Sequence, residues 1–253
     1  MIDTHCHLYT KEFDADSKEM MQRAGVAGVT KFYLPAIDQS CTERMDALEA
    51  AYPGKCFAMA GLHPCSVTAD YPREIAHLRD QLKQRKFAGI GETGLDFYWD
   101  KTFIKEQYAA LEIQVELALE YKLPLILHTR NATQATIDVI KKYKGTGLYG
   151  IFHCFGGTGE EAAQITDLDF YLGIGGVITY KNAGLAEVLT GIDLKYLVLE
   201  TDAPYLAPAP MRGKRNESAW LIYIAEKLAS VKNISTEEVQ RITTANAEKI
   251  FGV

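Results

Sequence analysis

Short runs of apolar residues alternate with longer amphipathic stretches along the chain, at intervals of about 20 to 35 residues. Eight of these runs have the length and composition of strands: residues 2–5, 30–37, 57–62, 88–92, 125–128, 149–153, 170–174 and 196–201. The stretches between them carry apolar residues at spacings of three and four, which is typical of helices that bury one face. Strands alternating with helices predict an α/β fold, a single (β/α)8 TIM barrel spanning residues 1–253.

Two of the predicted helices have recognisable ends. Residues 103–121 carry a broad apolar stripe, and Pro124 prevents continuation because proline lacks the N–H that a helix interior needs. A last helix follows Ser235, whose hydroxyl can cap the first turn, and Glu238 stands at the capping-box distance. The chain is therefore expected to close with a helix after the eighth strand.

Charge and cysteine content limit the possible partners and compartments. The 27 lysines and arginines against 33 acids give a net charge of −6, so any contact with nucleic acid must use a local basic patch. Five cysteines form no CxxC pair, which predicts free thiols in a reducing compartment. No signal-like start or membrane-length apolar run is present in the sequence. We expect a cytoplasmic protein with no membrane association and no obligate protein partner.

The residues best suited to bind a metal or take part in catalysis share one position in the pattern. Each stands at or just beyond the C-terminal end of a predicted strand: His5, His7, His63, Glu92, His128, His153 and Asp202. Parallel barrels bring these strand ends together at one mouth, where their active sites lie. A lone histidine here would more often be a hydrogen-bonded core residue, but five of the six histidines at one mouth predict a metal site.

The first strand offers the most local metal signal. The two-residue period of a strand turns His5 and His7 to one face and leaves Cys6 to pack on the other. Two imidazoles on one face can share a cation, although this spacing alone fits a pair of core histidines equally well. Glu92, which ends an apolar strand among glycines, adds a carboxylate that can bridge two ions.

The last strand carries two acids, Glu200 and Asp202, on one face, and a barrel interior tolerates such a pair only if cations or donors compensate. We assign Asp202 as a metal ligand that also accepts a proton from the attacking water, and Glu200 as a residue that orients a ligand. His77 falls in a helical stretch and is expected at the surface. Tyr98 and Trp99 either line a substrate groove or pack within their loop.

Seven segments form a recognisable series that covers nearly the whole chain: DTHCHL (3–8), GLHP (61–64), GETGLD (91–96), HTR (128–130), HCFGG (153–157), ETDAPYL (200–206) and RGKRNE (212–217). In this order they resemble the TatD-type deoxyribonuclease family of amidohydrolase-like metal hydrolases. The resemblance implies a barrel with two divalent ions, Mg, Mn or Zn, and cleavage of DNA phosphodiesters, often from the 3′ end.

The resemblance also implies roles for individual residues. One ion would be held by His5, His7 and Asp202 and the other by His128 and His153, with Glu92 as a bridge and His63 facing the substrate phosphate. Two positions depart from the family pattern. Tyr9 stands where many relatives carry an acid, and Ser218 stands where proline is usual. Neither is expected to touch a ligand.

Together these observations predict a divalent-metal-dependent deoxyribonuclease, a 3′-5′ exonuclease acting on single-stranded DNA or 3′ ends through two-metal activation of water. The expected catalytic residues are Asp202, Glu92 and His63. The expected phosphate-binding residues are His63, Arg130, Arg212, Lys214 and Arg215. For the last three, a solvated loop without a substrate role is the alternative.

Two other functions remain open. The same site could hydrolyse an ester or amide, as in deacylation of D-aminoacyl-tRNA, although a bridging Glu92 in place of a carbamylated lysine disfavours an amidase. A non-catalytic nucleic-acid-binding module is the second alternative. A small basic patch and a net charge of −6 argue against it, since strong binding of a polyanion needs more positive charge.

Overall fold

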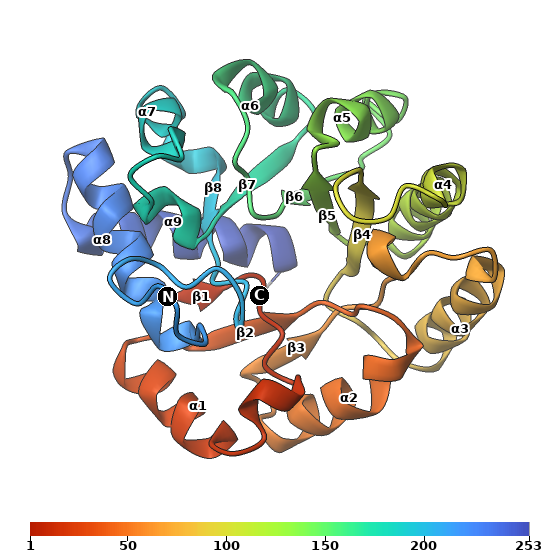
Figure 1. Cartoon of the computed structure of the whole chain (residues 1–253), viewed down its shortest axis with the longest axis horizontal. Helices are drawn as coiled ribbons and strands as arrows, with labels where there is room; N and C mark the ends of the chain where they lie inside the picture. The colour runs from red at the N-terminus through yellow and green to blue at the C-terminus, as the bar shows by residue number, and fades with distance from the viewer. Residues whose placement is uncertain (253) are drawn as a thin grey trace.

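The computed structural model describes residues 1–252, and eight parallel strands form its centre (Figure 1). They are β1 (Ile2–Asp3), β2 (Lys31–Leu34), β3 (Cys56–Ala58), β4 (Ile90–Asp96), β5 (Leu125–Arg130), β6 (Gly150–Phe152), β7 (Phe170–Ile174) and β8 (Leu197–Leu199). Neighbours in sequence pair in parallel within two groups, β1 to β3 and β4 to β8. All eight predicted strands are present.

Backbone hydrogen bonds join the two groups of strands at both gaps. Beyond β3, Ala60 pairs with Ile90 of β4, and the Gly91 N–H donates to the Ala60 carbonyl oxygen at 2.8 Å. On the other side, the Thr4 N–H donates to the Leu199 carbonyl oxygen of β8 at 3.1 Å. The ring of strands is therefore continuous, which confirms the predicted (β/α)8 barrel.

Helices surround this ring (Figure 1). They are α1 (Ser17–Val26), α2 (Thr42–Ala51), α3 (Tyr71–Gln84), α4 (Ile104–Tyr121), α5 (Thr133–Lys141), α6 (Gly159–Thr166), α7 (Leu185–Thr190), α8 (Leu221–Lys232) and α9 (Thr236–Phe251). Helix α4 starts one residue later than predicted and ends where Lys122 turns left-handed, two residues before Pro124. Ser235 caps α9 as predicted, but the expected capping box is incomplete because the Glu238 carboxylate accepts from Arg241 instead.

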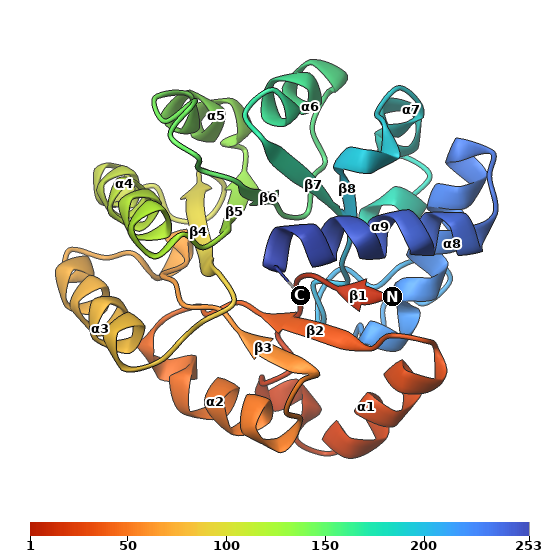
Figure 2. The same ribbon diagram turned by 180° about the vertical axis from the view of Figure 1, so that it is seen from behind.

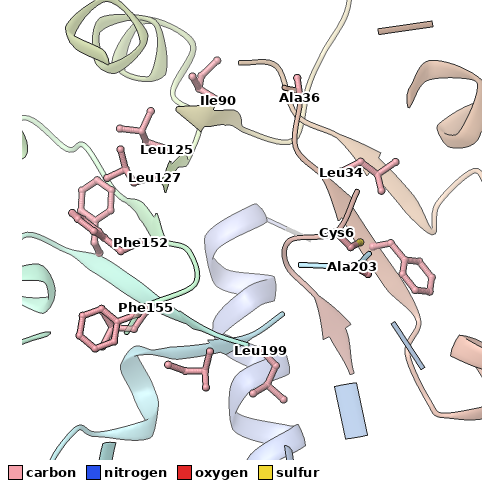
Figure 3. Packing of buried hydrophobic residues seen from close by; sticks show 14 of the residues in the cluster. Cys6, Leu34, Ala36, Ile90, Leu125, Leu127, Phe152, Phe155, Leu199 and Ala203 are labelled. Atoms are coloured by element: carbon pink, nitrogen blue, oxygen red, sulfur yellow. The ribbon is translucent and has the colours of Figure 1, made fainter. Parts of the chain in front are cut away.

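Successive residues of each strand face opposite sides of the barrel wall. Leu125 and Leu127 of β5 pack in the outer hydrophobic cluster between strands and helices, whereas Ile126 belongs to a separate cluster inside the ring. Figure 3 shows Leu125, Leu127 and Phe152 within the outer cluster. Each such buried side chain stabilises the fold by roughly 1.5–3 kcal/mol.

The inner cluster fills one end of the barrel. It consists of Ile2, Tyr33, Met59, Ile126, Ile151 and Val198 from the strands, with Ala247 and Ile250 from α9. Figure 2 shows α9 lying across this end. The Tyr33 ring stacks on Phe251 with a centroid distance of 3.5 Å. Helix α9 therefore seals the end at which the strands begin.

Strand β4 is longer than predicted. Its pairing with β5 shifts register between Ile90 and Thr93 and then continues to Asp96, which lies opposite Arg130. Glu92 is therefore inside the strand, not at its end as predicted.

Within residues 1–252, no helix combines the length and apolar character needed to cross a membrane.

Candidate active site

The end of the barrel where the strands finish opens into a pocket of about 680 Å³. Its lining includes five of the six predicted metal ligands, namely His7, Glu92, His128, His153 and Asp202. The sixth, His5, is fully buried, and its ring stacks on His153 with a centroid distance of 3.8 Å. The fold thus gathers all six residues at one mouth.

Glu92 lies at the centre of the cluster, and its two carboxylate oxygens face different histidines. Oε2 lies 3.1 Å from His5 Nε2 and 3.4 Å from His7 Nε2. Oε1 lies 3.0 Å from both His128 Nδ1 and His153 Nε2. A carboxylate in this position has one oxygen available to each of two groups of imidazoles.

Asp202 completes the group around Oε2 of Glu92. Its Oδ1 lies 3.5 Å from His7 Nε2 and 3.7 Å from His5 Nε2. The residue has a φ of 55°, a left-handed conformation that non-glycine residues adopt where surrounding contacts hold them. One such contact is the hydrogen bond from its N–H to the His5 carbonyl oxygen at 2.9 Å. The conformation directs a second carboxylate toward the first-strand histidines.

The contact of His7 Nδ1, the ring nitrogen that points away from Glu92, determines which nitrogen of this ring can bind a cation. The Tyr9 hydroxyl donates its only proton to the Pro35 carbonyl oxygen at 2.6 Å, so it accepts from His7 Nδ1, 2.9 Å away. In the neutral ring, Nε2 then carries a lone pair facing Glu92 and Asp202. Tyr9 therefore touches a proposed ligand, and the expectation that this departure lies away from the ligands is wrong.

Carboxylates occupy the equivalent outer positions on the other side of Glu92. Asp96 Oδ2 lies 2.9 Å from His128 Nε2, and Glu200 Oε1 lies 3.3 Å from His153 Nδ1. Because an ionised carboxylate only accepts hydrogen bonds, both rings donate outward and turn their lone pairs toward Glu92. Glu200 stands where a residue that orients a ligand is expected.

A nitrogen lone pair and a carboxylate oxygen that face each other repel unless a positive charge lies between them. When no metal cation is bound, a proton on the imidazole supplies that charge. Burial alone would lower the pKa of His7, but the carboxylates of Asp202 and Glu92 raise it to about 9. Burial is likewise outweighed at His153, where Glu92 and Glu200 hold the pKa well above its usual value. Imidazole nitrogens and carboxylate oxygens at these distances fit divalent cations, which would replace the protons.

His63 differs from the other four imidazoles at the mouth. Its Nδ1 accepts from the Cys65 N–H at 3.0 Å, so the neutral ring carries its proton on Nε2. That N–H lies 3.3 Å from Glu92 Oε1. Burial lowers the pKa of His63, which keeps the ring neutral near pH 7. Although His63 lies within ligand distance of Glu92 and His128, its tautomer suits a hydrogen-bond donor better than a ligand.

The predicted phosphate-binding cations do not all reach the pocket. Arg130, at the end of β5, lines it. Arg212 and Lys214 are exposed on the loop after β8 and lie outside the residues that line the pocket. The Arg212 guanidinium instead lies over the Tyr180 ring, 4.2 Å from its centroid.

Arg215 has partners elsewhere in the fold. It donates to the two carboxylate oxygens of Asp16 at 2.6 and 2.8 Å, and its guanidinium lies over the Phe13 ring. Arg23 of α1 also bonds Asp16 and joins the Glu217 carboxylate to the same network. These contacts fasten the loop after β8 to α1, which favours the alternative of a loop without a substrate role for Arg215.

Three other residues singled out in the sequence have defined places. His77 lies on α3 away from the mouth, where it is half-buried, and its Nε2 lies 3.1 Å from Thr42 Oγ1. Trp99 lines the pocket and is 65% exposed, and Tyr98 is 50% exposed. Trp99 therefore lines the pocket, and the Tyr98 ring packs edge-on against it with a centroid distance of 4.9 Å.

Asp96 was missed as a functional residue, although a signal was present. It stands four residues after Glu92, which places both on one face of an extended strand. Because the predicted strand ended at Glu92, the shared face of Glu92 and Asp96 was not recognised.

Ser218 lies away from the proposed ligands, as expected for this departure from the family pattern. Its hydroxyl donates to Asp3 Oδ2 at 2.6 Å.

A parallel barrel whose mouth gathers imidazoles around a buried carboxylate defines the class of metal-dependent hydrolases. The sequence model of the family described as TatD related DNase matches residues 2–252. The chain therefore belongs to the TatD-related DNase family, which confirms the resemblance seen in the sequence.

Individual relatives match over their full lengths. The chain is 35% identical over 255 residues to the uncharacterized metal-dependent hydrolase YabD of Bacillus subtilis, covering 100% of this chain and 99% of YabD. It is 31% identical over 260 residues to the 3′-5′ ssDNA/RNA exonuclease TatD of Pantoea ananatis, covering 100% of both. The crystal structure of YjjV, a TatD homologue from Escherichia coli, superposes with a TM-score of 0.94 at 29% identity, covering 100% of this chain and 98% of YjjV.

Proposed function

We propose that this protein is a nuclease that uses two divalent ions to hydrolyse phosphodiester bonds of single-stranded DNA, removing nucleotides from the 3′ end. The observation that carries the proposal is the environment of Glu92, whose two oxygens face separate groups of imidazoles at 3.0 to 3.4 Å. The relative named as a 3′-5′ ssDNA/RNA exonuclease supports the substrate and the polarity.

In this proposal, His5, His7 and Asp202 would hold one ion, and His128 and His153 would hold the other, with the Glu92 carboxylate between the two groups. Tyr9, Asp96 and Glu200 hold the rings with their lone pairs turned inward. Nitrogen and oxygen ligands of this kind accept Mg, Mn and Zn.

Bound ions lower the pKa of water and stabilise charge on the phosphoryl oxygens. The protein residues position the substrate and move the protons. Although burial opposes it, the neighbouring His7 lowers the pKa of Asp202, so the carboxylate is ionised at neutral pH and can accept a proton from the attacking water. The Nε2–H of His63 donates to a phosphoryl oxygen. Arg130 pairs with a phosphate at the pocket rim.

The test is hydrolysis of 5′-labelled single-stranded DNA by chelator-treated protein, with and without Mg, Mn or Zn, beside an Asp202→Asn variant. We expect metal-dependent shortening in single-nucleotide steps that Asp202→Asn abolishes. Measured binding of two ions without any shortening of DNA would overturn the nuclease proposal and favour an ester or amide substrate.

A further inference from the structure

A small aromatic patch next to Arg130 borders the pocket. Tyr98 and Trp99 follow β4 directly and are 50% and 65% exposed. The Arg130 guanidinium lies 4.0 Å from the centroid of the Tyr98 ring and 5.1 Å from that of Trp99. Two rings and a planar cation thus form one surface, which we name the rim platform: Tyr98, Trp99 and Arg130.

Exposed aromatic side chains are concentrated at this mouth. Of the six large hydrophobic residues that are exposed within residues 1–252, four lie on the two loops that border the pocket: Tyr98, Trp99, Tyr205 and Leu206. Tyr205 and Leu206 follow β8, which stands opposite β4 in an eight-stranded ring. Apolar surface left uncovered on two sides of a pocket that contains charged side chains marks a place where apolar parts of a ligand can bind.

The rim platform is fixed to the ligand cluster through one carboxylate. Asp96 Oδ1 accepts from the Tyr98 N–H at 2.8 Å and from the Trp99 N–H at 2.9 Å. Its other oxygen, Oδ2, lies 2.9 Å from Nε2 of the ligand His128. The carboxylate that orients a metal ligand therefore also holds the aromatic loop at a set place beside it.

Arg130 adds a positive charge that the fold does not neutralise. Its side chain is exposed, and among residues 1–252 no carboxylate forms an ion pair with it. By contrast, Arg23 and Arg215 are paired with acids. In a chain of net charge −6, an unpaired guanidinium stacked on aromatic rings suits a ligand that combines an anion with a π-system.

We propose that the rim platform is a nucleobase subsite, on which a base at the 3′ end of a single strand stacks against Trp99 while Arg130 contacts the adjoining phosphate. This rests on the proposed nuclease function and specifies how its substrate is recognised. Paired bases inside a duplex already stack on one another and cannot lie on the Trp99 ring. The subsite therefore selects single-stranded ends without reading the sequence.

The test removes the base and the ring separately. Two 5′-labelled single-stranded oligonucleotides, one normal and one with abasic sites at its two 3′-terminal positions, are cleaved by wild type, Trp99→Leu and Trp99→Phe. Leucine keeps apolar bulk and removes the aromatic ring, whereas phenylalanine keeps a stacking face. For the wild type, we expect KM to rise about tenfold on the abasic substrate, with a smaller change in kcat.

The variants distinguish stacking from other roles. Trp99→Leu is expected to show the same raised KM on both substrates, and Trp99→Phe is expected to restore most of the preference for the normal end. Equal KM values of the wild type on both substrates, or a preference that survives in Trp99→Leu, would overturn the nucleobase subsite alone. A metal-loaded wild type that leaves both substrates intact would overturn the nuclease function and the subsite with it.

Discussion

The two ends of the barrel interior have opposite characters, although the same strands build both. A step of two residues along a strand separates an apolar side chain at the sealed end from a polar one at the mouth: Ile126 and His128, Ile151 and His153, Val198 and Glu200. Because the strand period is two, both members of each pair face the interior. One end is a hydrophobic plug, and the other is a cluster of imidazoles and carboxylates.

This difference shows how the molecule separates stability from chemistry. At the sealed end, burial of apolar side chains against α9 stabilises the fold. At the mouth, burial of Glu92, His5 and His153 costs free energy unless protons or cations neutralise the carboxylates. Variants at the two ends should therefore fail in different ways.

The largest effect is expected at the mouth. Glu92→Gln leaves an amide that cannot bridge two cations, so we expect kcat on single-stranded DNA to fall by about 10³-fold or more. Titration with Mn should show fewer than two bound ions. Urea unfolding in chelator should show a loss of stability, because the protonated rings of His7 and His153 lose the carboxylate that faces them. Full activity with two ions bound would contradict the role of Glu92.

At the sealed end, Ile151→Ala should lower the stability of the fold without lowering activity. Loss of this fully buried side chain leaves a cavity, and we expect the free energy of unfolding to fall by about 2–5 kcal/mol. Activity per folded molecule should stay near that of the wild type, because His153 keeps its contacts with Glu92 and Glu200. Urea unfolding and kcat on the same preparation measure both. A metal-binding defect larger than the stability loss would break the separation between the ends.

The response to pH sharpens the comparison at the mouth. In the metal-free protein the pKa of His7 is about 9, above its ordinary 6.5, so the stabilisation from its protonated ring is complete below pH 6.5 and is lost as the pH rises through 9. Metal binding needs the neutral ring. The extra stability conferred by Mg should therefore grow from pH 6.5 to 9, by at most about 3 kcal/mol. Unfolding with Mg and with chelator measures it, and a flat difference would contradict the assigned protonation.

The smallest effects are expected from residues behind the ligands. Tyr9→Phe removes the acceptor for His7 Nδ1, and Glu200→Gln replaces the charged acceptor beside His153 Nδ1 with a neutral amide, so we expect Mn affinity to fall by about 10- to 100-fold in each. Tyr33→Phe is the matched control, because within residues 1–252 the buried Tyr33 hydroxyl has no hydrogen-bond partner. Calorimetric titration of the three variants compares them. Equal affinities for Tyr9→Phe and Tyr33→Phe would remove Tyr9 from the site.

Local periodicity was enough to place all eight strands and to bring His5, His7 and His153 to one mouth. It could not place features that depend on pairing between distant segments. The extension of β4 to Asp96 follows from its register with β5, and this concealed the partner of His128. The structural role of Arg215, which fastens the loop after β8, follows from its contact with Asp16, 199 residues away in the chain.

The outer partner of His7 shows the same limit in a single residue. The spacing of Tyr9 from His7 indicates a shared face, but the direction of their hydrogen bond depends on Pro35, which takes the phenol proton. Sequence patterns therefore gave the residue types at the site. The protonation that prepares each ring for a cation required the folded chain.

The central claim of the proposed function is that the residues around Glu92 would hold two cations. Anomalous diffraction from crystals of the wild-type protein grown with Mn tests it directly. We predict two peaks on opposite sides of Glu92, one beside Oε2 near His7 and Asp202 and one beside Oε1 near His128 and His153. A single peak, or two peaks that do not share Glu92, would contradict the claim.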